Sequence, residues 1–259
     1  KTLPRGQYVL SHPWLKANVT DMLTRQELLI DPAWFKGNRV LDAGCGNGRW
    51  SYGLTKLGAQ VTAVDYNAIA IEETRRALAE QAVEPHFHQS PLEELENVLP
   101  PDDRFDLVFC WGVAHHCRSF NEAIRQLCRL VKDGGVLYLY LYGRESIPFD
   151  DDLELFKERV RYNVLPTPEA KLAFLREKAG GDEQRIHNMH DIYAPLINRR
   201  LSFDAVKAQL ELLGLHRVER TIDHTELFIR AFKGDVRAVE PHLLAPASPP
   251  YWFEHHGET

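Results

Sequence analysis

Two short apolar runs, joined through a glycine-rich loop and a helix-like stretch, most constrain what this chain can fold into. The first run, residues 39–43, contains Asp42 near its end, and glycines follow at positions 44, 46 and 48. The second run, residues 60–65, ends in Asp65. Glycines let the backbone approach a ligand closely, and an acid at the end of the second strand can accept hydrogen bonds from ribose hydroxyls. The pattern predicts a nucleotide-binding half-fold.

The spacing of the glycines and the charge of this loop distinguish between the known classes of nucleotide-binding protein. A dinucleotide fold requires Gly-x-Gly-x-x-Gly, but Arg49 stands where the third glycine is needed, which disfavours a nicotinamide dehydrogenase. The Gly-Lys-Ser/Thr of a phosphate-binding P-loop is absent. Asp42 would repel a pyrophosphate, so a cationic or zwitterionic ligand suits the loop better.

The stretch Asp42-Ala-Gly-Cys-Gly-Asn-Gly48 resembles the first motif of the class I S-adenosylmethionine (SAM) dependent methyltransferases. The resemblance implies that this loop holds the methionine part of SAM, with Asp42 near the amino group. Gly44, Cys45 and Gly46 would give access to the backbone. Asp65 would bind the ribose hydroxyls.

The same resemblance implies further contacts with the cofactor. Tyr66, beside Asp65, would lie against the adenine, and Ser90-Pro91 would contact the adenine edge. The family often has an acid followed by a small or apolar residue at this second place, and this chain departs from that pattern. Cys110 and Trp111 end a later strand and would face the methionine side. For Tyr66, Cys110 and Trp111, simple packing or surface exposure is the alternative.

Strand and helix patterns alternate along the chain. We expect parallel strands at 39–43, 60–65, 105–111 and 136–142 and a short one at 86–89, with helices between them, and the apolar run of 105–111 fits a buried parallel strand. Residues 203–213 predict an amphipathic helix, and 215–221 and 226–233 alternate like two strands of a hairpin. We therefore expect an α/β fold with a Rossmann-like seven-stranded sheet, five strands parallel and the last two a reversed pair, with helices on both faces.

The chain divides into five segments by pattern. Residues 1–38 predict an N-terminal cap segment, with a helix over about 19–29. The SAM-binding core follows over 39–145, and its last helix and strand pair over 201–235. Residues 146–200 predict a helical insert that caps the substrate site, and 236–259 an irregular tail. The resemblance implies that the two regions outside the core make the substrate pocket, and Tyr8, Trp14, Tyr142 and Tyr193 are its predicted substrate contacts.

The segment Trp111-Gly-Val-Ala-His-His-Cys117 follows the fourth strand and resembles a similar segment of small-molecule methyltransferases. Its loop opens at the carboxyl edge of the sheet, where ligands bind in such folds. His115 or His116 could take a proton from a hydroxyl acceptor. The alternative is that these histidines only shape the loop.

A third feature is His187-Asn-Met-His190-Asp191-Ile-Tyr193. We expect a lid segment here, with His190 as a further candidate catalytic residue. His187 and His190 lie three residues apart, so a metal site with Asp191 and His115 is an alternative. The leading hypothesis uses no metal.

Composition narrows the function classes. A net charge of −6 disfavours a dedicated nucleic-acid binder. No apolar run is long enough for a membrane span, and four cysteines without Cys-x-x-Cys spacing indicate free thiols of a cytoplasmic protein. We expect a SAM-dependent methyltransferase for a small molecule, with an oxygen acceptor favoured over nitrogen or carbon. The alternatives are an RNA or protein methyltransferase and a non-catalytic SAM-binding partner subunit.

Overall fold

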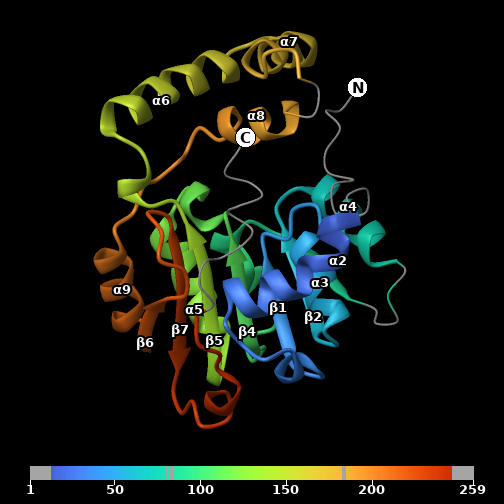
Figure 1. Ribbon diagram of the computed structural model, residues 1–259, viewed down its shortest axis with the longest axis vertical. Helices are drawn as coiled ribbons and strands as arrows, with labels where there is room; N and C mark the ends of the chain where they lie inside the picture. The colour runs from blue at the N-terminus through green and yellow to red at the C-terminus, as the bar shows by residue number, and fades with distance from the viewer. Residues whose placement is uncertain (1–12, 80, 82–84, 183–184, 247–259) are drawn as a thin grey trace.

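A seven-stranded mixed sheet forms the centre of the computed structural model, which describes residues 13–79, 81, 85–182 and 185–246 (Figure 1). The strand order is β3-β2-β1-β4-β5-β7-β6. The first five strands pair in parallel, and β7 pairs antiparallel with both β5 and β6, which confirms the predicted fold class. The strands are β1 (Arg39–Ala43), β2 (Gln60–Asp65), β3 (His86–Gln89), β4 (Phe105–Trp111), β5 (Val131–Leu141), β6 (Leu215–Arg220) and β7 (Leu227–Lys233).

Apolar layers cover both faces of the sheet. One face packs against α5 (Phe120–Leu130), α9 (Phe203–Leu212) and the short helix η3 (Leu92–Asn97). The other packs against α3 (Arg49–Lys56), α4 (Ala68–Leu78) and the N-terminal helices. Because strands such as β4 are buried on both faces, their sequences read as continuous apolar runs and were predictable to the residue.

The largest difference from the expected strands is at β5. The sequence predicts a start at Val136, because Asp133-Gly134-Gly135 is typical of a turn. The strand instead begins at Val131, which pairs with Phe105 before the register shifts. An irregularity in the ladder absorbs the two glycines, so the chain stays in the sheet.

The N-terminal segment also differs from expectation. The predicted helix over about 19–29 is α2 (Pro13–Asp21) followed by the π-helix η1 (Met22–Glu27). Proline is favoured at the start of a helix, where its missing N–H costs nothing. The π-helical turn cannot be read from apolar spacing, because its period differs from 3.6.

Three helices follow β5 and lie beyond the carboxyl edge of the sheet: α6 (Phe149–Asn163), α7 (Pro168–Lys178) and α8 (Ile186–Tyr193). In Figure 1 they form a separate layer, with α8 between the sheet and the other two. This layer, called the helical cap below, has its own small apolar core, made by Tyr162, Leu175, Ala179, Ile186 and Met189.

Short helices complete the connections: η2 (Pro32–Phe35), η4 (Ala114–His116), η5 (Arg144–Ser146) and η6 (Glu240–His242). Several helices start at a side-chain cap. Ser119, Thr167 and Ser202 accept backbone N–H bonds at the starts of α5, α7 and α9, as expected for hydroxyl residues at these positions.

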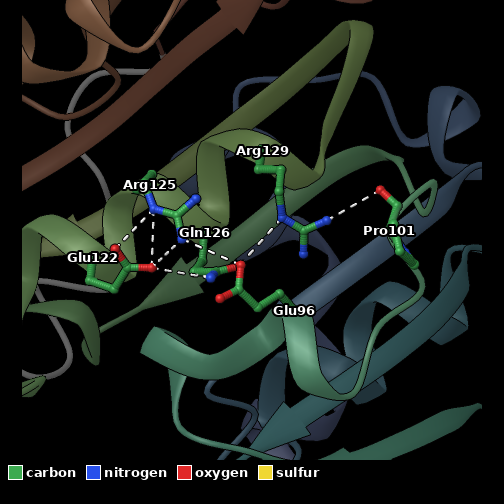
Figure 2. A network of polar contacts seen from close by, with 6 residues as sticks. All are labelled: Glu96, Pro101, Glu122, Arg125, Gln126 and Arg129. Atoms are coloured by element: carbon green, nitrogen blue, oxygen red, sulfur yellow. Dashed lines mark hydrogen bonds and ion pairs between the residues drawn. The ribbon is translucent and has the colours of Figure 1, made fainter.

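A polar network joins α5 to η3 and to the loop that follows η3 (Figure 2). Arg125 pairs with Glu122 at 2.5 Å and with Glu96 at 3.4 Å. Arg129 donates to Gln126 and to the carbonyl of Pro101. The two ion pairs are solvent-exposed, although Gln126 is buried, so each pair adds little stability.

None of the helices among the described residues is both long enough and apolar enough to cross a membrane.

Candidate active site

The glycine loop after β1 is fixed by backbone geometry. Gly44, Gly46 and Gly48 all have positive φ, at 91°, 55° and 84°. The N–H groups of Gly44 and Cys45 both donate to the carbonyl of Val64 on β2, at 2.7 and 3.0 Å. A Cβ at Gly44 would lie 2.4 Å from the Val113 side chain. The loop after β1 therefore packs directly against the loop after β4.

Asp65 ends β2 beside the glycine loop. Its carboxylate accepts the N–H of Gly46 at 3.1 Å and that of Asn67 at 2.9 Å. Only 8% of Asp65 is exposed, whereas Tyr66 beside it is 70% exposed. A held carboxylate next to an outward-facing aromatic ring fits the predicted contacts with a ribose and an adenine.

Asp42 points away from solvent. It is 1% exposed and accepts a 2.5 Å hydrogen bond from the Ser51 hydroxyl on α3. Burial raises its pKa to about 7. Asp42 thus joins β1 to the helix that follows the loop, and a direct contact with a methionine amino group stays a prediction.

The remaining predicted cofactor residues are mostly buried. Cys45 and Cys110 are 5% and 0% exposed, and burial raises the pKa of both thiols. Ser90 is 4% exposed, and its hydroxyl donates to the carbonyl of Pro91. The thiol of Cys110 lies within the apolar core. Side-chain contacts of these residues with a ligand stay predictions.

Sequence reasoning missed an acidic side chain near the glycine loop. Glu27, at the end of the π-helix η1, is fully buried and accepts a hydrogen bond from the Tyr138 hydroxyl. Burial raises its pKa to about 7, while Tyr138, the Trp111 indole and the Arg49 charge act in the opposite direction. The one feature of the sequence that could have indicated a buried Glu27 is its position directly before the apolar run Leu28-Leu29-Ile30.

Arg49, considered above only as the residue that breaks a dinucleotide motif, also has a defined place. Its guanidinium lies over the rings of Trp50 and Trp111, at 4.4 and 4.7 Å from their centroids. Cations are attracted to the faces of aromatic rings. Arg49 therefore bridges the start of α3 and the end of β4, beside the predicted methionine side of the site.

The predicted histidine pair lies on η4. His115 is 0% exposed, and its ring lies 4.0 Å from the rings of both His116 and Tyr142. The Nδ1 atom of His116 lies 2.7 Å from the carbonyl oxygen of Ile197. Burial lowers the pKa of both histidines. Both are therefore neutral near pH 7, and since a carbonyl only accepts, the proton of His116 is on Nδ1.

Three arginines surround this pair. Arg200 lies over the Tyr142 ring and pairs with Glu226 at 3.3 Å and Asp152 at 3.5 Å. Arg199 donates to the backbone carbonyls of Cys117 and Arg118, and its own N–H donates to the carbonyl of His115. The third, Arg159, comes from α6. The cap and the loop after β4 therefore meet at the histidines.

The other predicted residues lie further out. His190 on α8 has Nδ1 3.6 Å from Asp191, and Tyr193 packs against Phe174 inside the cap. Trp14 packs on the edge of the sheet core, and Tyr8 lies outside the described residues. Within the part of the chain that the structure describes, no three His, Cys, Asp or Glu side chains are grouped to hold a metal ion. His187, named in the metal alternative, has a side chain outside that part.

A surface depression also lies at the opposite, amino edge of the sheet, lined by residues that include Trp34, Asp106 and Lys132. It contains none of the predicted site residues. The glycine loop, Asp65 and the histidine pair instead meet at the carboxyl edge, where ligands bind in open α/β sheets.

Comparisons with known proteins agree with this geometry. Residues 40–135 match a family described as a methyltransferase domain. A ubiquinone biosynthesis O-methyltransferase of Alkalilimnicola ehrlichii is 37% identical over 100 residues, 39% of this chain and 40% of that protein. One from Xanthomonas oryzae is 34% identical over 113 residues, 44% of this chain and 46% of that protein. The chain thus matches less than half the length of these curated relatives.

Solved structures show the same fold at low identity. Magnesium protoporphyrin IX methyltransferase from Synechocystis, with bound S-adenosylhomocysteine (SAH), is 17% identical with a TM-score of 0.51, over 85% of this chain and 82% of that one. An O-methyltransferase family protein from Burkholderia thailandensis is 15% identical with a TM-score of 0.54, over 87% of this chain and 57% of that one.

Proposed function

The chain carries a class I SAM-dependent methyltransferase domain, and on that premise we propose that it transfers a methyl group from SAM to a hydroxyl oxygen of a small molecule. One observation carries the proposal: the glycine loop, the Asp65 carboxylate and the histidine loop are packed together at one edge of the sheet, through the contact of Gly44 with Val113. The curated relatives are named for O-methylation, which favours an oxygen acceptor.

Asp65 and Tyr66 are the residues we assign to the nucleoside. The Asp65 carboxylate is already oriented by two backbone N–H groups, so it can accept hydrogen bonds from ribose hydroxyls without rearranging. The exposed ring of Tyr66 offers an apolar face to the adenine. The positive φ angles of the glycine loop leave backbone groups accessible to the methionine part.

When bound, SAM supplies a methyl group on a positively charged sulfur, which is already activated for transfer. The protein's tasks are then to position the acceptor and to remove its proton. His116 suits the second task, because the carbonyl of Ile197 holds its proton on Nδ1 and leaves Nε2 as the accepting nitrogen. As the new oxygen–methyl bond forms and the sulfur–methyl bond breaks, the hydroxyl proton passes to Nε2. The products are the methyl ether and SAH.

Calorimetry with SAH, followed by transfer of labelled methyl from SAM to a panel of phenols, tests the proposal. Asp65→Asn should weaken SAH binding by about 1–3 kcal/mol, because the ribose hydroxyls lose a charged acceptor. The control is Asp102→Asn, which changes an exposed acid outside the site. A wild-type chain that binds NADH but not SAH would contradict the proposal.

The role of His116 has a separate test. His116→Gln should lower turnover by about 10²–10⁴-fold while SAH affinity is kept, and the loss should shrink as pH rises. His86→Gln, at an exposed position on β3, is the control. Unchanged turnover in His116→Gln would mean that positioning alone drives the transfer.

A further inference from the structure

The first observation concerns a buried cation in the cap. Arg159 on α6 is 3% exposed. Its Nε donates to the carbonyl of Ile192 at 2.7 Å, and its two terminal nitrogens lie 2.7 and 2.9 Å from the Asn198 side-chain oxygen, with that amide turned to satisfy both groups. Among the described residues no carboxylate lies within ion-pair distance of Arg159. Its partners are thus neutral, and part of its hydrogen-bonding capacity remains available.

The second observation concerns His115. It is 0% exposed, and neither ring nitrogen has a hydrogen-bond partner among the residues that the structure describes. Leaving a buried polar group unsatisfied costs about 1–3 kcal/mol, so such a group in a folded protein calls for an explanation. His115 follows β4 at the carboxyl edge, where the acceptor must enter. A bound ligand that accepts or donates a hydrogen bond would satisfy the ring.

The third observation concerns charge. After burial and the neighbouring His116, the charges that act on His115 are those of Arg200, Arg159 and Arg199, all of them positive. Arg200 forms ion pairs with Glu226 and Asp152, and the charge of Asp152 also acts on Arg159 without forming an ion pair with it. Arg199, like Arg159, donates to neutral carbonyls. The nearby Asp191 lies 3.6 Å from His190 instead. Asp191 also acts on His116, so the arginines near His115 are partly offset, but Arg159 itself makes no ion pair with a described carboxylate.

We propose that the methyl acceptor carries a carboxylate, which binds Arg159 and accepts a hydrogen bond from His115. This inference rests on the proposed function, because it describes the acceptor of that reaction. A guanidinium matches the planar geometry of a carboxylate, and hydrogen bonds between charged groups are about twice as strong as neutral ones. A neutral imidazole has one N–H to donate. The carboxylate would give Arg159 an ionic partner and His115 a hydrogen-bond partner.

A second source of carboxylate must be distinguished, because the methionine part of SAM also has one. Arg49 lies beside the glycine loop and the predicted methionine side, whereas Arg159 lies in the cap. The two assignments differ in one measurable respect. If Arg159 bound the methionine carboxylate, Arg159→Gln would weaken SAH binding.

The experiment uses the full chain saturated with SAH and matched pairs of acid and primary amide. The pairs are 4-hydroxybenzoate with 4-hydroxybenzamide, 3,4-dihydroxybenzoate with its amide, and 4-hydroxyphenylacetate with its amide. Binding is measured by calorimetry, and methyl transfer by mass spectrometry of the products. We expect the wild type to favour the acid of at least one pair by about tenfold or more, the effect of one charge-assisted contact.

Variants of the chain show which residues cause the preference for the acid over its amide. Arg159→Gln should remove it, Arg159→Lys should keep part of it, and His115→Phe should reduce it, all with unchanged SAH affinity. Arg161→Gln is the matched control, because it removes the same charge from the exposed side of the same helix. Unchanged SAH affinity also shows that the variants fold.

Three results would overturn the inference. In the first, no acid binds better than its amide. In the second, the preference for the acid survives Arg159→Gln. In the third, Arg159→Gln loses SAH affinity. Failure of the proposed function would look different, since the wild type would then bind no SAH or transfer no methyl to any compound.

Discussion

The glycine-loop region and the helical cap are held together by different kinds of contact. Backbone groups and buried acids fix the glycine loop: Gly44 and Cys45 bond to Val64, and Asp65 holds Gly46. Among its described residues, the cap has a core of five buried apolar residues, and α6 leaves four large apolar side chains exposed, at Phe149, Leu153, Phe156 and Val160. The cap is therefore less tightly packed than the glycine-loop region.

Gly44→Ala should have the largest effect and tests the rigidity of the cofactor side. A Cβ would lie 2.4 Å from Val113, and φ is 91°, so both a clash and backbone strain arise. We expect a loss of about 2–5 kcal/mol in the free energy of unfolding, together with loss of SAH binding. Urea unfolding and calorimetry measure the two effects.

Gly37→Ala separates the clash from the strain. Gly37 has a similar φ of 80°, but no atom lies within 4 Å of an added Cβ. This control should cost only about 1–2 kcal/mol, the strain alone. Equal losses in the two variants would mean that contact with Val113 does not fix the glycine loop.

Leu175→Ala tests whether the helical cap can be destabilised without affecting the cofactor side of the molecule. Leu175 is fully buried in the cap core, so its truncation should destabilise the cap by about 2–5 kcal/mol. Hydrogen exchange should quicken in α6, α7 and α8, while SAH affinity changes less than about twofold, because the cap core is separate from the two sheet cores. A tenfold loss of SAH affinity would show instead that the two regions are coupled.

Glu27→Gln tests the buried acid of the cofactor side through pH. The folded pKa of Glu27 is about 7, raised from 4.5 by burial, so the folded chain keeps a proton that the unfolded chain releases. Stability therefore falls as pH rises from about 4.5 to about 7. Glutamine cannot ionise, so the variant should gain roughly 2–3 kcal/mol over the wild type between pH 4 and pH 8.

The measurement is urea unfolding across that pH range. Asp42 has a folded pKa of about 7 as well and preserves part of the slope in the variant. Glu154→Gln, on the exposed side of α6, serves as control and should leave the slope unchanged. A wild-type and variant difference that is constant with pH would show that Glu27 keeps its charge when buried.

Arg125→Gln should have the smallest effect. The network of Figure 2 is exposed, so its loss should cost less than about 1 kcal/mol, and less still at high salt. Thermal unfolding at low and high salt checks this. A larger loss would mean that these surface ion pairs contribute more to stability than exposed pairs usually do.

Much of the fold could be predicted from the sequence, because buried parallel strands read as apolar runs. The bounds of β1 to β4 agree with the prediction, since tertiary packing and local pattern favour the same limits. The start of β5 and the π-helix η1 could not be predicted. Both depend on pairing or packing with distant residues that overrides the local signal.

The residues of the candidate site also fall into a group that the sequence predicted and a group that it did not. Asp42, the glycines and Asp65 lie within 24 residues of one another, so their spacing alone indicated a common loop. Glu27, Arg159 and Arg200 reach the site from separate segments, and their partners are backbone carbonyls or distant side chains. No spacing rule relates such residues, which is why sequence reasoning did not identify them.

The side chain of Arg230 has a consequence for how the chain is made. From β7 it donates to the carbonyls of Leu28 and Leu29, at 2.7 and 2.8 Å, just after Glu27. Leu29 also accepts the N–H of Leu244, and Ile30 pairs with Leu243. These contacts join the first and last parts of the chain. During synthesis, the segment that follows Glu27 therefore lacks these contacts until more than two hundred further residues have been added to the chain.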